Sequence, residues 1–165
     1  MWIYLLRHGI AEDPRPGIAD DDRALTDEGR EGLRDARHAW SRLVQPPDLV
    51  ITSPLRRARE TADIFRETFD AEPPLRVEAA IIPGAEPARV VTLLESEMLS
   101  QTRSVAVVGH EPNIGYLFGA LLTGQLRISV SMERGMLVGL QSEGATSLIT
   151  GLRFVLRQQD AARIT

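Results

Sequence analysis

Two histidines and an arginine stand where short apolar runs of the sequence end. Arg7 and His8 follow the run at residues 2–6, and His110 follows the run at residues 104–108. Burying a charged or titratable side chain without a partner costs free energy, so this placement indicates a function. A guanidinium is a permanent cation whose fork of N–H donors fits phosphate oxygens. A neutral imidazole is a competent nucleophile toward phosphorus. The residue types therefore favour chemistry on a phosphoryl group.

A third apolar run, residues 48–52, ends in a similar way. It is followed by Ser53 and Pro54, and then by Arg56 and Arg57. If the three runs are parallel neighbouring strands, their carboxyl ends meet at one edge of a sheet, where α/β proteins bind ligands. Several cations in one pocket repel one another and need an anion to neutralise them. Helix N-termini after the second and third runs would add N–H donors, so the sequence predicts a phosphoryl-binding pocket at this edge.

The two imidazoles are expected to divide the work in such a pocket. One can attack phosphorus, and the other can donate a hydrogen bond to a phosphoryl oxygen. Neighbouring arginines lower the pKa of an imidazole, which keeps the ring unprotonated and reactive near neutral pH. Phosphoryl transfer depends mostly on positioning and charge stabilisation, so the pocket needs neither a metal ion nor a cofactor. The arginines would also repel a cation, and no His-x-x-x-His spacing is present.

Apolar runs alternate with amphipathic segments along most of the chain. Strands are predicted at residues 2–6, 48–52, 75–77, 104–108, 127–130, 136–140 and 148–156. Helices are predicted to begin at Thr26, Ser53, Pro87 and Pro112. In the second of these, Ser53 is the expected cap and Pro54 the first helical residue. The alternation predicts an α/β fold of three layers, α/β/α, around a mixed, mostly parallel sheet.

Length and composition bound the class of protein. The chain has 165 residues, 43% hydrophobic and 25% charged, and we expect one domain over residues 1–165. A formal net charge of -4 gives no basic field for nucleic acid or an anionic membrane. The longest hydrophobic stretch, residues 115–122, is too short to span a bilayer, and no leader pattern follows Met1. We therefore expect a cytoplasmic protein; with no cysteine, disulfides and thiolate metal sites are excluded.

Four short motifs together resemble those of a known family. The match is carried by Leu6-Arg7-His8-Gly9, Leu25-Thr26 with Gly29, Ser53-Pro54 followed by Arg57-Ala58 and Thr61, and Val108-Gly109-His110-Glu111-Pro112. In this order and approximate spacing they resemble the histidine phosphatase superfamily. The short chain is most similar to the SixA-type phosphohistidine phosphatases, small bacterial enzymes that remove phosphate from histidines of signalling proteins.

The resemblance implies a role for each matching residue. His8 is the nucleophile that becomes phosphorylated, and Arg7, Arg57 and His110 form the rest of the phosphate pocket. Arg57 is chosen over its neighbours because it directly precedes Ala58 in the S-P-x-x-R-A pattern. The implied fold is that of the phosphoglycerate mutase type, a mixed and mostly parallel sheet between helices, with no metal and no cofactor.

One departure from the resembled family concerns a catalytic acid. Larger members carry a glutamate that protonates the leaving alcohol, where this chain has Ala80 or Ile81. Glu78, Glu86 and Glu111 are the nearby candidates, and solvent is the remaining source of a proton. An alkoxide needs a proton in order to leave, so the missing acid disfavours alkyl phosphomonoesters. Phosphohistidine fits better, since its imidazole leaves readily once protonated. Residues 58–109 are also too few to hold an added cap domain, which predicts an open pocket.

Several polar residues near these motifs have less certain roles. Gly9 and Asn113 are further candidates for phosphate binding. The acidic run Asp20–Asp22 is expected to lie in a solvated surface loop, and whether that loop covers the site is left open. His38 falls off the apolar face of its helix and is expected to be exposed.

Three functions fit these residues. The leading hypothesis is a metal-independent phosphohydrolase whose substrate is a phosphorylated protein bearing phosphohistidine. A phosphatase of sugar phosphates or other small metabolites could use the same machinery, and a competent acid in the pocket would favour it. A binding module that keeps the anion pocket without turnover is the third. The sequence leaves the oligomeric state and the physiological substrate open.

Overall fold

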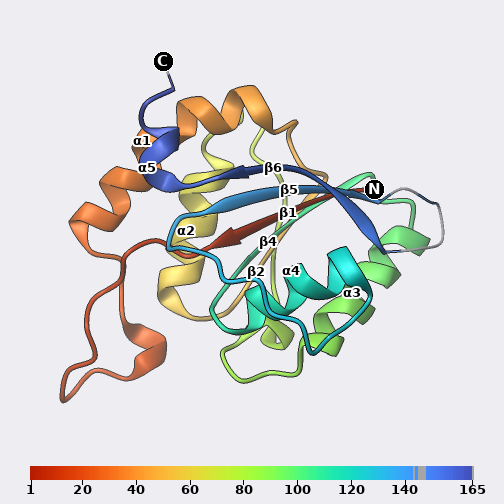
Figure 1. The fold of residues 1–165 in the computed structure, drawn as a ribbon. Helices are drawn as coiled ribbons and strands as arrows, with labels where there is room; N and C mark the ends of the chain where they lie inside the picture. The colour runs from red at the N-terminus through yellow and green to blue at the C-terminus, as the bar shows by residue number, and fades with distance from the viewer. Residues whose placement is uncertain (143, 145–147, 165) are drawn as a thin grey trace.

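The chain forms a six-stranded sheet with helices on both faces (Figure 1). The computed structural model describes residues 1–142, 144 and 148–164. The strands are β1 (Trp2–Arg7), β2 (Leu49–Thr52), β3 (Leu75–Val77), β4 (Ser104–Gly109), β5 (Leu137–Ser142) and β6 (Thr150–Leu156). The α-helices are α1 (Asp27–Leu43), α2 (Arg56–Arg66), α3 (Pro87–Leu99), α4 (Asn113–Thr123) and α5 (Gln158–Ala161), and the 3₁₀ turns are η1 (Asp20–Asp22) and η2 (Ala79–Ile81).

The order of the strands brings the predicted site elements together. Along the sheet the order is β3-β2-β4-β1-β5-β6. β4 pairs in parallel with both β1 and β2, β3 is parallel to β2, and β5 and β6 add antiparallel pairs. The carboxyl ends of β1, β4 and β2 therefore meet at one edge. The predicted mixed, mostly parallel sheet between helical layers is confirmed.

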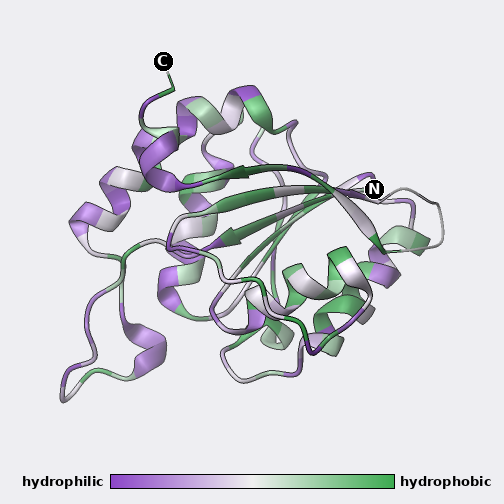
Figure 2. Ribbon diagram, viewed as in Figure 1, coloured by the Kyte–Doolittle hydropathy of each residue, from purple (hydrophilic) through white to green (hydrophobic). Residues whose placement is uncertain are grey.

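The layers follow from the alternation of side chains along the buried strands. In β1, Tyr4 and Leu6 belong to the core that includes Trp40 of α1. Ile3 and Leu5 point the other way, into the core formed with α3 and α4. Figure 2 shows the central strands as mainly hydrophobic, whereas α1 contains many hydrophilic residues. Because both faces of the sheet are covered, the strands carry the near-continuous apolar runs that the sequence displays.

The four predicted helices are present, and one begins later than predicted. The Oγ1 of Thr26 accepts a hydrogen bond from the N–H of Gly29 at 3.0 Å, as expected of the α1 cap. α2 begins at Arg56, so the prediction that Ser53 caps it was wrong. The Ser53 N–H is still bonded to the carbonyl of Val108, which keeps the chain extended beyond β2. No helix in the described part of the chain is long and apolar enough to cross a membrane.

The strand predicted at residues 127–130 is not formed. The segment crosses α4 instead, and the Val130 N–H donates to the carbonyl of Gly115 at 3.0 Å. A Cβ at Gly119 would lie 2.0 Å from the carbonyl oxygen of Ile128, so the crossing requires glycine on that face of the helix. The last two predicted strands appear, with shifted bounds, as β5 and β6.

Candidate active site

A cavity of about 330 Å³ opens at the carboxyl ends of the parallel strands. We call it the strand-end cavity. Its wall includes the four residues that the sequence singled out, Arg7, His8, Arg57 and His110. The first two come from the end of β1 and the residue after it, the third from the first turn of α2, and the last from the residue after β4. The topology thus brings together residues that lie about a hundred positions apart in the sequence.

The His8 ring is held in an orientation that leaves one nitrogen available. Its backbone N–H donates to the carbonyl of Gly109, which continues the β1–β4 pairing. Its Nδ1 lies 2.7 Å from the carbonyl oxygen of Gly9. A carbonyl can only accept, so Nδ1 carries the proton and Nε2 of the neutral ring carries the lone pair. This tautomer is the one that a nucleophile attacking through Nε2 requires.

Gly9 permits the close packing that holds this ring. A Cβ at this position would lie 2.8 Å from Cδ1 of Leu33 on α1. The Gly9 N–H donates to Oγ1 of Thr61 at 3.2 Å, and that hydroxyl donates to the carbonyl of Arg57 at 2.7 Å. Thr61 therefore ties the segment after β1 to the first turn of α2. The N–H of Gly9, a candidate phosphate donor, is occupied by this contact.

The His110 ring faces that of His8, and neither of its nitrogens is hydrogen-bonded in the described structure. The two ring centroids are 5.0 Å apart with an interplanar angle of 53°. His110 is only 2% exposed, and among the described residues neither of its ring nitrogens has a hydrogen-bond partner. Buried polar atoms are nearly always satisfied in folded proteins. An orphaned imidazole on the wall of a cavity therefore indicates a place for a ligand.

Both imidazoles are neutral at physiological pH. Burial, followed by the positive charges of Arg57 and Arg7, lowers the pKa of His8 to about 4, against the opposing Gly9 carbonyl. Burial also lowers the pKa of His110 to about 3, with the neighbouring His8 and Arg57 adding to the effect. The sequence predicted the lowering through the arginines, whereas desolvation is the larger cause.

The guanidinium of Arg7 is held by one of its nitrogens, while another has no partner among the described residues. Its Nη1 donates to the carbonyl of Met132 at 2.6 Å, while among the described residues its buried Nε has no partner. The carboxylate of Glu111 accepts from the N–H of Met132 at 2.7 Å. Burial lowers the pKa of Arg7, and the negative charge of Glu111 opposes this effect. The segment around Met132 thus anchors both the arginine and its counter-charge.

Arg57 is occupied by a carboxylate from the acidic run. Its Nη1 donates to the backbone carbonyl of Asp20 at 2.7 Å, and its Nη2 donates to Oδ2 of the same residue at 2.9 Å. Hydrogen bonding, first to Arg23 and then to Arg57, lowers the pKa of Asp20. The Nε of Arg57 is buried without a partner among the described residues. As expected, all three residues of the run are exposed, and Asp20 in addition reaches the site, which the sequence leaves open.

Arg134 is a residue of the site that the sequence analysis did not single out. It lies in the turn before β5 and lines the strand-end cavity. The N–H of Gly135 donates to the carbonyls of Arg7 and His8 at 3.1 and 3.2 Å, which fixes this turn beside the end of β1. The positive charge of Arg134 contributes to the lowered pKa of His8. Its position depends on a turn far along the chain, for which the sequence carries no periodic signal.

Asn113 lies away from the strand-end cavity. Its Oδ1 accepts from the N–H of Gly84 at 3.1 Å, and its Nδ2 donates to the carbonyl of Ala85. It is absent from the residues that line the cavity in the described structure. The amide of Asn113 therefore braces the segment between η2 and α3. His38, as predicted, is exposed.

The carboxylates proposed as a proton source are placed differently from one another. Glu78 pairs with Arg76 at 3.2 Å, and Glu86 is exposed at the start of α3. Neither lines the strand-end cavity, whereas Glu111 does, together with Asp13 and Asp20 of the β1–α1 loop. The place where the resembled family carries its acid is taken by η2, which has no acidic residue. In the described part of the chain, no three of its His, Asp and Glu side chains are grouped to hold a metal ion.

Comparisons with known proteins show which phosphoryl-handling proteins this chain is similar to. An α/β sheet with paired imidazoles and guanidiniums at its carboxyl edge is typical of proteins that handle phosphoryl groups. The sequence profile of the Histidine phosphatase superfamily (branch 1) matches residues 3–81. The first half of the chain is thus similar to this superfamily. The matched range includes Arg7, His8 and Arg57.

Two individual relatives are similar to this chain over most of its length. The chain is 29% identical over 145 residues to an uncharacterized protein of Picosynechococcus sp., covering 88% of this chain and 87% of that protein. It is 29% identical over 130 residues to the Phosphohistidine phosphatase SixA homolog of Haemophilus influenzae, covering 73% and 77%. The solved structure of the protein histidine phosphatase SixA complexed with tungstate superposes with a TM-score of 0.84 at 21% identity, over 97% of this chain and 99% of that one. This last likeness establishes the fold.

Proposed function

We propose that the chain is a metal-independent phosphohydrolase that works through a phosphohistidine at His8 and acts on phosphohistidine in proteins. One observation carries the proposal: a neutral His8 with Nε2 available shares a cavity with the unpartnered nitrogens of Arg7, Arg57 and His110. These donors surround a space whose wall also carries the carboxylates of Asp13, Asp20 and Glu111, of which Asp20 is bonded to Arg57. A phosphoryl dianion supplies the acceptors that they lack.

The first step is attack on phosphorus. Nε2 of His8 forms a bond to phosphorus while the bond between phosphorus and the substrate nitrogen breaks. Arg7 and Arg57 stabilise the charge on the phosphoryl oxygens, and His110 donates a hydrogen bond to one of them. The substrate imidazole leaves with the electron pair of the broken bond and takes a proton from water. The Nδ1–H of His8 stays bonded to Gly9, so the ring becomes positively charged once phosphorylated.

The second step returns the enzyme to its starting state. Water attacks phosphorus, the bond to Nε2 of His8 breaks, and the proton from water passes to a phosphate oxygen. The same guanidiniums stabilise this transition state, since the charge again lies on the phosphoryl oxygens. The positive charge on the phosphorylated ring, in a site whose burial lowers the pKa of His8 to about 4, makes that ring a good leaving group.

The leaving group supports phosphohistidine as the substrate class. The place of the family's acid is taken by η2, and Glu78 and Glu86 lie outside the strand-end cavity. Glu111 lies on the cavity wall, but its carboxylate accepts from the N–H of Met132 at 2.7 Å. An alkoxide leaves poorly without a positioned acid, whereas a protonated imidazole leaves readily. The relative from Haemophilus influenzae carries the name of a phosphohistidine phosphatase. The described segment between α2 and β4 adds only β3, η2 and α3 to the layers, which leaves the cavity accessible to a side chain borne on a protein.

The test is a covalent label on His8. The enzyme is mixed with a ³²P-phosphohistidine peptide, denatured in alkali after milliseconds to seconds, and analysed by peptide mapping. We expect label on the peptide that contains His8, and release of inorganic phosphate on longer incubation. His8→Asn keeps a donor for the Gly9 carbonyl but no nucleophile, so it should lose the label and at least about 10⁴-fold in turnover. His38→Asn, on an exposed histidine, is the matched control.

The outcomes separate the competing functions. Turnover of a sugar phosphate or aryl phosphate without turnover of phosphohistidine would replace the proposed substrate class. Saturable binding of the peptide with neither label nor released phosphate would indicate a binding module. Unchanged turnover by His8→Asn would overturn the mechanism itself.

A further inference from the structure

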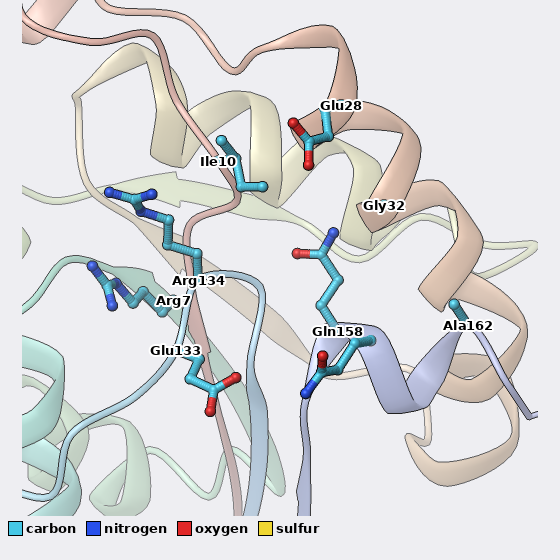
Figure 3. Close-up of a pocket in the computed structure, with 9 residues that line it drawn as sticks. Arg7, Ile10, Glu28, Gly32, Glu133, Arg134, Gln158 and Ala162 are labelled. Atoms are coloured by element: carbon cyan, nitrogen blue, oxygen red, sulfur yellow. The ribbon is translucent and has the colours of Figure 1, made fainter.

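A second cavity, of about 650 Å³, lies on the α1 and α5 side of Arg7 (Figure 3). We call it the α5-side cavity. It is larger than the strand-end cavity, which measures about 330 Å³, and both sizes fall in the range of ligand sites. None of the catalytic steps described above takes place in this cavity. Its wall is formed by residues of α1, the turn before β5, and α5, with the residues after β1.

Two arginines connect the two cavities. Arg7 and Arg134 line both of them. In Figure 3 their guanidinium groups point to the same side, away from Gln158, which stands in the α5-side cavity. The backbone contacts of Gly135 with the carbonyls of Arg7 and His8 fix this shared wall. A molecule whose phosphoryl group is held at Arg7 can therefore extend its remainder past Arg134 into the α5-side cavity.

The α5-side cavity carries charges of both signs. Its cations are Arg7 and Arg134, on the wall shared with the strand-end cavity. Its carboxylates are Glu28, in the first turn of α1, and Glu133, which directly precedes Arg134, and Gln158 of α5 lies between the two in Figure 3. Both carboxylates are exposed, and in the part of the chain that the structure describes neither side chain accepts a hydrogen bond. Asp160 and, less strongly, Glu133 raise the pKa of the exposed Arg157. Exposed carboxylates beside an amide favour a cationic group attached to a hydrogen-bonding chain.

We propose that the α5-side cavity binds the polypeptide next to the phosphohistidine and favours a lysine or arginine there. The proposal rests on the proposed function, since it places the phosphorylated side chain at His8. The dianion lies against the guanidiniums, the neighbouring backbone passes Arg134, and a cationic side chain on either side of Gln158 meets Glu28 or Glu133. The Gln158 amide can donate to and accept from the peptide groups between them.

The experiment compares two phosphohistidine peptides that differ only in the flanking residues. One carries lysine beside the phosphohistidine and the other glutamate, and an aryl phosphate serves as a substrate without a peptide. We expect the native chain to favour the lysine peptide by at least about fivefold in kcat/KM, mainly through KM, as two partly exposed ion pairs would give. The double variant E28Q/E133Q should reduce this preference to below about twofold. Its kcat/KM for the aryl phosphate should stay within about twofold of the native value.

A matched control distinguishes an effect of the α5-side cavity from an effect of the negative charge on the protein surface in general. Glu31→Gln removes a carboxylate from the exposed face of the same helix, and that residue does not line the α5-side cavity. It should keep the preference for the lysine peptide. Equal turnover of the two peptides by the native chain, or a preference that survives E28Q/E133Q, would overturn the assignment of this cavity alone. Failure to dephosphorylate either peptide while the aryl phosphate is hydrolysed would overturn the proposed function as well.

Discussion

The candidate site is built from two kinds of residue that differ in how they are held. His8 and His110 follow buried parallel strands, Arg57 lies in the first turn of α2, and the three are 8%, 2% and 4% exposed. Asp20 and Arg134 come from a loop and a turn, and the Asp20 side chain is 55% exposed. The first set has its geometry fixed by the sheet and can carry chemistry that tolerates little displacement. The second set can adjust affinity and charge, so substitutions there should have smaller effects.

The largest effect after loss of the nucleophile is expected at Arg57. Arg57→Lys keeps the charge but loses the fork that spans the space between Asp20 and the cavity. We expect kcat/KM for a phosphohistidine peptide to fall by about 10²-fold or more, the size seen when one transition-state donor is removed. Arg59→Lys, on an exposed residue of the same helix, should leave it unchanged. Activity within threefold of native in Arg57→Lys would mean that this guanidinium does not contact the phosphoryl group.

The two buried imidazoles should make the fold sensitive to acid. The folded-state pKa values of His8 and His110, about 4 and about 3, lie below the ordinary value near 6.5. The unfolded chain therefore binds more protons below pH 6.5, and the free energy of unfolding falls as pH decreases from 6.5 toward 4. Each group contributes at most about 1.4 kcal/mol per pH unit. His110→Asn should make the slope between pH 6 and pH 4 shallower by about 1 kcal/mol per unit in urea titrations, and an unchanged slope would contradict the burial of a neutral ring.

A smaller effect is expected at Arg134. Arg134→Gln removes a cation from the wall of the strand-end cavity without touching the elements that hold His8. We expect kcat/KM for phosphorylated substrates to fall by about fivefold, with a weaker dependence on ionic strength. The pKa of His8, followed by NMR, should rise because one source of its lowering is removed. Arg89→Gln, exposed on α3, is the control, and equal effects of the two variants would rule out a specific role.

The smallest effect is expected at Asp20. Its carboxylate competes with a bound dianion for Nη2 of Arg57. Asp20→Asn should therefore lower the inhibition constant of inorganic phosphate by about threefold, the scale of one partly exposed ion pair. Asp21→Asn, on an exposed neighbour in η1, should not change it. Weaker inhibition in Asp20→Asn would mean that the carboxylate positions Arg57 for phosphate and does not compete with it.

The residues at the ends of the parallel strands are the part of the site that could be predicted from the sequence. β1, β2 and β4 are short apolar runs covered on both faces, and their ends mark His8 and His110 directly. The convergence of these ends required only that the three strands be parallel neighbours, as they are. Arg57 was selected by its position in a family pattern and not by periodicity. The sheet-borne part of the site thus follows from local sequence and general rules of topology.

The loop-borne part could not be predicted, for physical reasons. The position of Asp20 depends on the path of the long β1–α1 loop, which extends away from the sheet in Figure 1 before α1 begins. The position of Arg134 depends on the turn that Gly135 fixes against β1. The missing strand at 127–130 has a similar cause, since contact with Gly115 and Gly119 of α4 outweighs the local preference for a strand. In each case a contact distant in sequence decides the conformation.

The most direct test of the account is a crystal structure with tungstate or vanadate at neutral pH. We expect one anion in the strand-end cavity, with its central atom about 3–3.5 Å from Nε2 of His8. Arg7, Arg57 and His110 should each donate to its oxygens. An anion bound elsewhere while this cavity stays open to it, or one held in the cavity with Nε2 of His8 turned away, would contradict the central claim.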